Sequence, residues 1–166
     1  MPNAFLAFGN NHPWQVEVWD LKSEKWLVTL TGHKMFIQGL EFSPDGRSLA
    51  TCGPDARVNV WDIPAGTLRN SLRGNLTSFT ALAISPDGQR LFAGGGNGVI
   101  KVWDMETLQE VATLNQTGDY INALRFLPDG NTLVSVTRSS LHLWRAPLLK
   151  QIDAGSPPGP GENGAY

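Results

Sequence analysis

Three side chains that could together activate a nucleophile lie in one short stretch of the sequence. His33, Thr51 and Asp55 supply an imidazole, a hydroxyl and a carboxylate, the groups of a base-assisted nucleophile. Residues 94–98 read Gly-Gly-Gly-Asn-Gly and could offer backbone N–H groups to a phosphate. Either chemistry requires elements that bring the groups together, so the surrounding secondary structure decides their role.

The composition is that of a globular chain and excludes several classes of protein. The 166 residues carry a formal net charge of −2, 41% are hydrophobic, and Cys52 is the single cysteine. An intramolecular disulfide is therefore excluded, which favours a reducing compartment, and we expect a cytoplasmic protein. No window approaches the roughly 18 apolar residues of a membrane span, and no run of Lys or Arg indicates nucleic-acid binding. We expect neither a membrane nor a nucleic acid as partner.

The dipeptide Trp-Asp recurs at a nearly constant interval. It begins at Trp19, Trp61 and Trp103, and Trp144 followed by Arg145 marks a fourth position, with intervals of 42, 42 and 41 residues. A turn of the form Ser/Leu-Pro-Asp-Gly follows the same step, at residues 43–46, 85–88 and 127–130. Apolar positions keep this register too: Ile37, Phe79 and Ile121; Leu40, Leu82 and Leu124; Phe42, Ile84 and Phe126. The chain is therefore built from repeats of about 42 residues.

Each repeat contains the pattern of four short strands. In residues 32–73, apolar and polar residues alternate with a period of two over 37–42, 48–52, 57–61 and 67–72. Pro, Asp and Gly separate these segments and favour tight turns. No segment has an amphipathic helical pattern of useful length. A unit of four strands with this period is typical of one β-propeller blade.

These residues resemble the WD40 repeat family over positions 1 to about 152. The marks are Gly32-His33, the Ser-Pro-Asp-Gly turns, Leu49-Ala50-Thr51 before Asp55, and the closing residues 58–62, Val-Asn-Val-Trp-Asp. The resemblance implies an all-β, WD40-type β-propeller, here an open or partial arc of about four four-stranded antiparallel blades. The ending Leu-Trp-Arg-Ala-Pro at 143–147, followed by a Pro/Gly tail, is similar to the end of bacterial WD-repeat proteins, where such propellers often follow a signalling domain.

The repeat predicts the organisation of the whole chain. We expect an incomplete blade at 1–31, complete blades at 32–73, 74–115 and 116–152, and a disordered Pro/Gly-rich tail at 153–166. The first blade lacks its innermost strand, and the proline-rich tail cannot supply it. Two alternatives follow. Either the chain is the C-terminal portion of a larger propeller, or a ring forms from this chain alone, by association of two copies into a dimer or by imperfect closure of a four-bladed ring.

The resemblance implies a structural role for the four residues His33, Thr51, Asp55 and Trp61. In the family, Asp accepts a hydrogen bond from His, the imidazole continues to the hydroxyl, and Trp donates its indole N–H, so that each buried polar group is satisfied. The corresponding residues are Asn75, Ala93 and Asn97 beside Trp103 in the third unit, and Thr117, Ser135 and Ser139 beside Trp144 in the fourth. We therefore expect the network to decay along the chain and the second blade to be the most rigid.

No other residues form a convincing catalytic or metal-binding set. The glycine run lacks the Gly-Lys-Ser/Thr ending of a phosphate loop and falls on the turn before a third strand. His12, His33 and His142 occupy unrelated places in the repeat and have no metal-ligand spacing. We expect no catalytic residue, no metal and no cofactor.

The family resemblance implies a partner-binding rim. The residue before each inner strand lies at the narrower rim of the ring, where protein partners commonly dock. The candidate rim residues are Trp14, Met35, Phe36, Ser78, Tyr120 and Arg138, with His12 and Asp119 beside them. Aromatic and Arg side chains are frequent anchors of interfaces, although these residues could equally cover the ends of apolar sheets. The expected function is a non-enzymatic scaffold for protein partners. The alternative is a structural or sensor segment of a larger signalling protein, without binding of its own.

Overall fold

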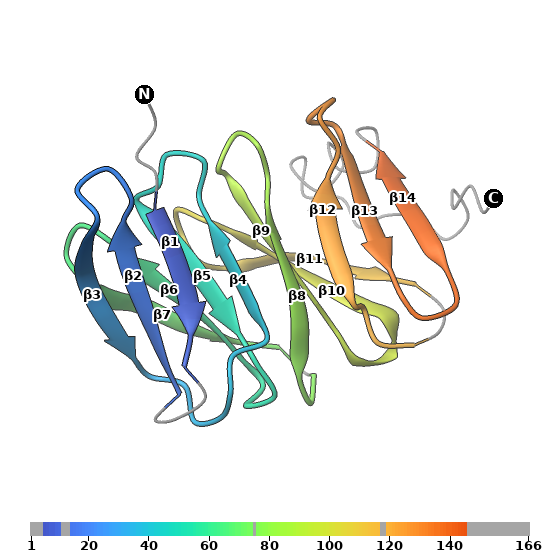
Figure 1. Cartoon of the computed structure of the whole chain (residues 1–166). Coiled ribbons are helices and arrows are strands. Elements are labelled where there is room, and N and C mark those ends of the chain that lie inside the picture. The colour runs from blue at the N-terminus through green and yellow to red at the C-terminus, as the bar shows by residue number, and fades with distance from the viewer. Residues whose placement is uncertain (1–4, 11–13, 75, 117–118, 146–166) are drawn as a thin grey trace. The chain divides into compact units, whose positions relative to one another are not determined.

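The computed structural model describes residues 5–10, 14–74, 76–116 and 119–145. Over these residues the chain forms 14 β-strands, one 3₁₀ turn and no α-helix, which confirms the expected all-β fold (Figure 1). No helix in the ranges just given is long and apolar enough to cross a membrane. The chain divides into two compact units, residues 1–79 and 80–166.

The first unit contains two antiparallel sheets. One has three strands, in the order β1 to β3, and the other has four, in the order β4 to β7. The strands are β1 (Phe5–Gly9), β2 (Gln15–Asp20), β3 (Lys25–Thr31), β4 (Gly39–Phe42), β5 (Ser48–Cys52), β6 (Arg57–Asp62) and β7 (Thr67–Arg73).

The second unit also contains two antiparallel sheets, and its first strand begins one residue before the unit does. The strands are β8 (Phe79–Ile84), β9 (Arg90–Gly95), β10 (Val99–Asp104) and β11 (Glu110–Asn115) in one sheet, and β12 (Ala123–Phe126), β13 (Thr132–Val136) and β14 (Leu141–Arg145) in the other. The 3₁₀ turn η1 (Gly96–Gly98) joins β9 to β10. The expected fourth strand of the last blade and the tail at 153–166 lie outside the described residues.

The recurring Pro-Asp-Gly segments form the turns between the two inner strands of each complete sheet. The Ser43 hydroxyl donates to Asp45 Oδ1 over 2.6 Å, and the same oxygen accepts the N–H of Arg47. Gly46 has φ = 71°, a left-handed conformation that glycine adopts without steric cost. The turn at 85–88 repeats this arrangement with Ser85 and Asp87. The spacing of the motif in the sequence is therefore the spacing of a turn.

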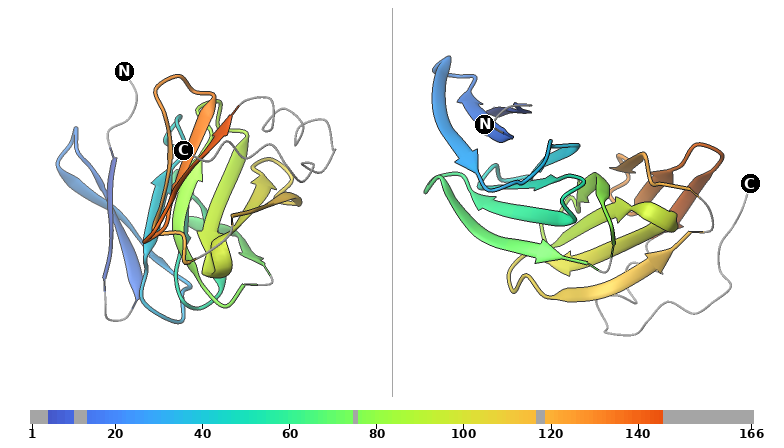
Figure 2. Two further views of the ribbon diagram at one scale, coloured as in Figure 1. Left: turned by 90° about the vertical axis from the view of Figure 1, so that its right-hand side faces the viewer. Right: turned by 90° about the horizontal axis from the view of Figure 1, so that it is seen from below.

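In each unit, the valine-rich face of one sheet packs against the tryptophan-bearing face of the next. In the first unit, Val16 and Val18 of β2 share a core with Leu49 and Trp61, and all four are at most 2% exposed. Figure 2 shows strands β1–β3, in blue, facing strands β4–β7, in cyan to green. Phe5 and Phe42 also meet across this interface, with ring centroids 5.9 Å apart.

The second unit repeats this packing. Ile100 and Val102 of β10 share a core with Leu133 and Trp144 of the last sheet. The sheets approach so closely at Gly94 that a Cβ there would lie 2.5 Å from Cγ2 of Ile121. The 42-residue repeat therefore corresponds to one sheet.

Candidate functional site

The four-stranded sheet of the first unit contains a chain of buried hydrogen bonds. Trp61 Nε1 donates to Thr51 Oγ1 over 2.8 Å, and Thr51 Oγ1 lies 2.7 Å from His33 Nε2. His33 Nδ1 lies 3.0 Å from Asp55 Oδ2, which also accepts the backbone N–H of Lys34. Because a carboxylate only accepts, Nδ1 carries the proton and Nε2 accepts from the Thr51 hydroxyl.

The network cannot act as a nucleophilic relay in this geometry. Thr51 is 0% exposed, and the side chains of His33 and Asp55 are 1% and 3% exposed. The Thr51 oxygen accepts from Trp61 and donates to His33 in the interior of the unit, so it has no access to a substrate. What the network can do is fix the loop that carries His33 onto the turn that carries Asp55.

Further backbone contacts tie the same loops together. Gln38 donates its N–H to the Cys52 carbonyl over 2.8 Å, and Phe79 donates to the Gly53 carbonyl over 3.2 Å. Gly53 itself packs so tightly against the Phe36 carbonyl that no Cβ fits between them. We call this region, formed by the connections after β1, β3, β5 and β7, the loop end of the first unit.

The loop end presents three large apolar side chains to solvent. Trp14 is 38% exposed, Met35 42% and Phe36 43%. Ser78, in the connection after β7, is half-buried. His12 lies outside the described residues. Of the candidate rim residues, Trp14, Met35, Phe36 and Ser78 therefore belong to connections at one end of the first unit's sheets.

The remaining candidates belong to the second unit. Tyr120 is 52% exposed in the connection between β11 and β12, next to exposed Asp119, and Arg138 is exposed in the turn between β13 and β14. Each unit thus presents its own set of candidate side chains.

The last sheet has a complete hydrogen-bond network, and the expectation that the network decays along the chain is wrong there. Trp144 Nε1 donates to Ser135 Oγ over 2.9 Å, and Ser135 donates to Gln116 Oε1 over 2.5 Å. Gln116 Nε2 then donates to Ser140 Oγ over 3.0 Å. Gln116 and Ser140 thus do what His33 and Asp55 do in the first unit, because a carboxamide also offers one acceptor and one donor group.

Two residue assignments in the last sheet change accordingly. Ser140 takes the place expected for Ser139, because it lies five residues after Ser135, whereas Asp55 lies four residues after Thr51. Thr117 lies outside the described residues, and the buried partner is its neighbour Gln116, which is 2% exposed. Each of the two partners is therefore one residue away from the position that the 42-residue step assigns.

Within the described residues, the other two sheets have no hydroxyl at the position of Thr51. In the third repeat, Ala93 is buried and has no side-chain polar group, whereas Asn97 is exposed with φ = 62°, so its role is in the turn. Asn75 is outside the described residues. In the first sheet, Phe8 occupies the position of Thr51, because Phe8 pairs with Glu17 in the same way that Thr51 pairs with Asn59. Phe8 has no hydroxyl to offer, and within the described residues the buried Nε1 of Trp19 has no hydrogen-bond partner.

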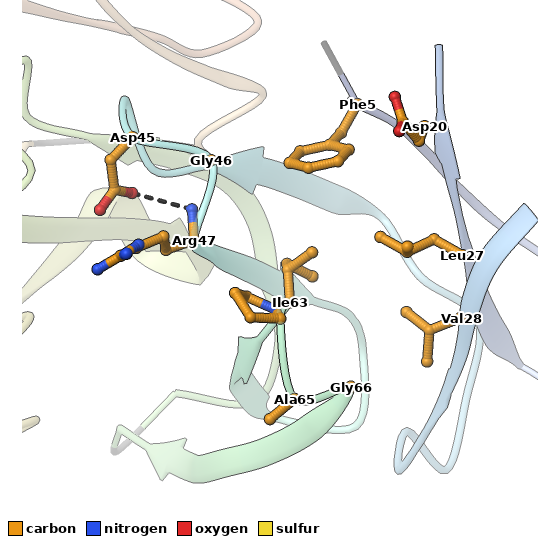
Figure 3. Close-up of a pocket in the computed structure, with 11 residues that line it drawn as sticks. Phe5, Asp20, Leu27, Val28, Asp45, Gly46, Arg47, Ile63, Ala65 and Gly66 are labelled. Carbon is orange, nitrogen blue, oxygen red and sulfur yellow. Dashed lines mark hydrogen bonds between the residues drawn. The ribbon is translucent and has the colours of Figure 1, made fainter. Parts of the chain in front are cut away.

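A cleft of about 500 Å³ opens at the opposite end of the first unit (Figure 3). Its walls include Phe5, Leu27, Val28, Ile63 and Pro64, and its charged lining residues are Asp20, Asp45 and Arg47.

Both carboxylates of the cleft are engaged in their own turns. The Lys22 N–H and the Ser23 hydroxyl lower the pKa of Asp20, and the Ser43 hydroxyl and the Arg47 N–H lower the pKa of Asp45. Each carboxylate therefore stays ionised as a turn acceptor, and the cleft has no acid–base pair for catalysis.

The described residues contain no group of three or more His, Cys, Asp or Glu side chains that could hold a metal ion. Burial raises the pKa of the Cys52 thiol to about 12, so the thiolate that a reactive or metal-binding cysteine needs is strongly disfavoured.

Comparison with known proteins identifies the repeat. The family profile described as "WD domain, G-beta repeat" matches residues 24–62, 66–104 and 108–145. The chain belongs to the WD40 repeat family. Each match begins near the last strand of one sheet and ends at the Trp-containing strand of the next. The four sheets are consistent with a partial WD40 β-propeller.

Two curated proteins illustrate the relationship. The chain is 37% identical over 54 residues to the "Periodic tryptophan protein 2 homolog" of Dictyostelium discoideum, and the match covers 32% of this chain and 6% of that protein. It is 43% identical over 49 residues to the "Nuclear distribution protein PAC1" of Mycosarcoma maydis, and this match covers 30% of this chain and 11% of that protein. The matched part is thus a small fraction of both relatives. WD40 repeat proteins are in general non-enzymatic scaffolds for protein interaction.

Proposed function

We propose that this WD40 chain is a non-enzymatic scaffold that binds a protein partner through the loop end of the first unit. The observation that carries the proposal is the exposure of Met35 and Phe36 in a connection whose His33 and Lys34 are hydrogen-bonded to Asp55, with exposed Trp14 at the same end of the unit. Large apolar side chains on a rigid support are suited to anchor a partner, because little conformational entropy is lost on binding.

The chemistry of these side chains favours a peptide segment with an apolar anchor. All three are aromatic or sulfur-containing, Met35 and Phe36 are adjacent in the sequence, and the formal charge of the whole chain is only −2. A polyanion would require a basic surface, so we propose a protein partner and neither nucleic acid nor a lipid surface. A cytoplasmic location, where Cys52 stays reduced, is part of this proposal.

Selection from a displayed peptide library tests the proposal without knowledge of the natural partner. The purified chain serves as bait, and the Met35→Ala/Phe36→Ala double variant serves for counter-selection. We expect peptides with a large apolar residue to be enriched, and their affinity for the double variant to fall by at least about tenfold, a loss typical of an interface anchor.

A matched control removes an apolar side chain of similar exposure elsewhere. Val111→Ala changes a residue that is 39% exposed on β11, in the second unit, and it should leave peptide binding unchanged. If no peptide is enriched, or if binding survives in the double variant, the loop end is not the docking surface. The chain would then be better described as a structural or sensor segment of a larger protein.

A further inference from the structure

The sheet-to-sheet interface of this chain has two complementary sides. On the tryptophan side, the positions equivalent to Leu49, Thr51 and Trp61 recur as Leu91, Ala93 and Trp103, and as Leu133, Ser135 and Trp144. All nine residues are at most 4% exposed. On the aliphatic side, the positions of Val16 and Val18 recur as Val58 and Val60 and as Ile100 and Val102, all at most 1% exposed.

The first sheet has a tryptophan side that is open to solvent. Leu6 pairs with Trp19 as Leu49 pairs with Trp61, and Phe8 stands at the position of Thr51. Leu6 is 49% exposed and Phe8 42%, whereas their equivalents are fully buried. We call Leu6, Phe8 and Trp19 the open tryptophan face.

The last sheet has an aliphatic side that is also open. Leu141 and Leu143 of β14 stand where Ile100 and Val102 stand in β10, and they pair with Val136 and Val134 of β13. Leu141 is 55% exposed and the other three are half-buried, whereas Ile100 and Val102 are 0% exposed. We call these four residues the open aliphatic face.

We propose that the open aliphatic face of one copy of this chain docks on the open tryptophan face of a second copy. Each copy carries both sides of an interface that the chain already forms twice, once within each unit. A second copy therefore presents the surface that each open face lacks, and no third component is needed. The proposal is independent of the loop end.

Charge supports this pairing. Glu17 pairs with Phe8 and lies on the same side of its sheet as the open tryptophan face. Arg125 and Arg145 lie on the side of β12–β14 that bears the open aliphatic face. Opposite charges at the margin of an apolar contact favour one docking orientation and discourage face-to-face pairing of like faces. The contact joins two different surfaces, so it either closes a ring of copies or continues as a larger assembly.

Sedimentation velocity on the full chain, from low to about 100 µM, tests the proposal. We expect the wild type to associate. Phe8→Asp and Leu141→Asp should each weaken association by roughly 100-fold or more, because docking would bury an unpaired carboxylate. Leu127→Asp, at an exposed turn leucine on neither face, should associate as the wild type does. Circular dichroism confirms that each variant folds, and Leu6→Lys replaces Phe8→Asp if that variant does not.

Mixing the two variants gives the decisive result. The Phe8→Asp chain keeps its aliphatic face and the Leu141→Asp chain keeps its tryptophan face, so an equimolar mixture should form a 1:1 heterodimer. A wild type that is monomeric up to the highest concentration would overturn the proposal. So would unchanged association of both single variants, or a mixture that stays monomeric while the wild type associates.

Discussion

At the scale of single residues, Asp55 shows why a buried carboxylate can be structural. Its Oδ2 accepts from both the His33 ring and the Lys34 N–H, so its loss leaves two donors without an acceptor. We expect Asp55→Ala to lower the free energy of unfolding by about 1–3 kcal/mol. Urea denaturation measures this, and Asn97→Ala is the comparison, because exposed Asn97 belongs to no buried network and should cost less. Equal losses would show that the network adds nothing.

Gln116 provides a second test at this scale. Its side chain joins Ser135 to Ser140 and is 2% exposed, so Gln116→Ala leaves the buried Ser135 hydroxyl without an acceptor and should cost about 1–3 kcal/mol. Ser139→Ala is the matched control, since the exposed Ser139 uses only its backbone N–H, and its effect should stay within about 0.5 kcal/mol. If Ser139→Ala lowered the free energy of unfolding more than this, Ser139 and not Ser140 would be the network residue, as the constant interval predicts.

The residues of these networks differ in how far the sequence predicts them. His33, Thr51, Asp55 and Trp61 follow from the family motif, and the structure places their side chains in contact. Gln116 and Ser140 could not be found by a constant interval, because each lies one residue away from the position that a 42-residue step assigns, and a carboxamide replaces the imidazole. Phe8 was missed for the same kind of reason, since the connection after β1 contains one residue more than its equivalent.

At the scale of elements, the turn between β5 and β6 contains two residues with opposite requirements. Gly53 packs against the Phe36 carbonyl, so Gly53→Ala forces atoms apart and should cost about 1–3 kcal/mol. Ala56 has φ = 59°, so Ala56→Gly relieves strain and should stabilise the chain by up to about 1 kcal/mol. Thermal and urea unfolding of both variants measure the two effects. Changes of the same sign would contradict this description of the turn.

The Asp-containing turns predict how stability depends on pH. Hydrogen bonds hold the pKa of Asp20, Asp45, Asp87, Asp104 and Asp129 below the usual 3.8. The unfolded chain therefore binds more protons near pH 4, so the stabilisation is present above that pH and is lost as pH falls through the folded-state values. The urea midpoint should drop between about pH 5 and pH 3, and less steeply in Asp45→Asn. A midpoint independent of pH over this range would refute the assignment.

At the scale of the whole molecule, the tryptophan repeat predicts more than its turns do. It indicated four sheets, their strand order and the absence of helices, because a period of about 42 residues with alternating apolar positions suits only a blade. The exposure of the first sheet could be predicted from the sequence only in part. A missing innermost strand was expected, but the pairing that brings Leu6 and Phe8 to the open side depends on a register that the sequence does not show.

The most direct test of this description is hydroxyl-radical footprinting of the six tryptophans, read out by mass spectrometry. If the repeated indoles mark successive sheets, Trp61, Trp103 and Trp144, each at most 4% exposed, should be protected. Trp14 and Trp26, 38% and 55% exposed, should be oxidised fastest, with Trp19 between the two groups. Equal oxidation of all six, or fast oxidation of the three protected indoles, would contradict the burial of the repeated indoles.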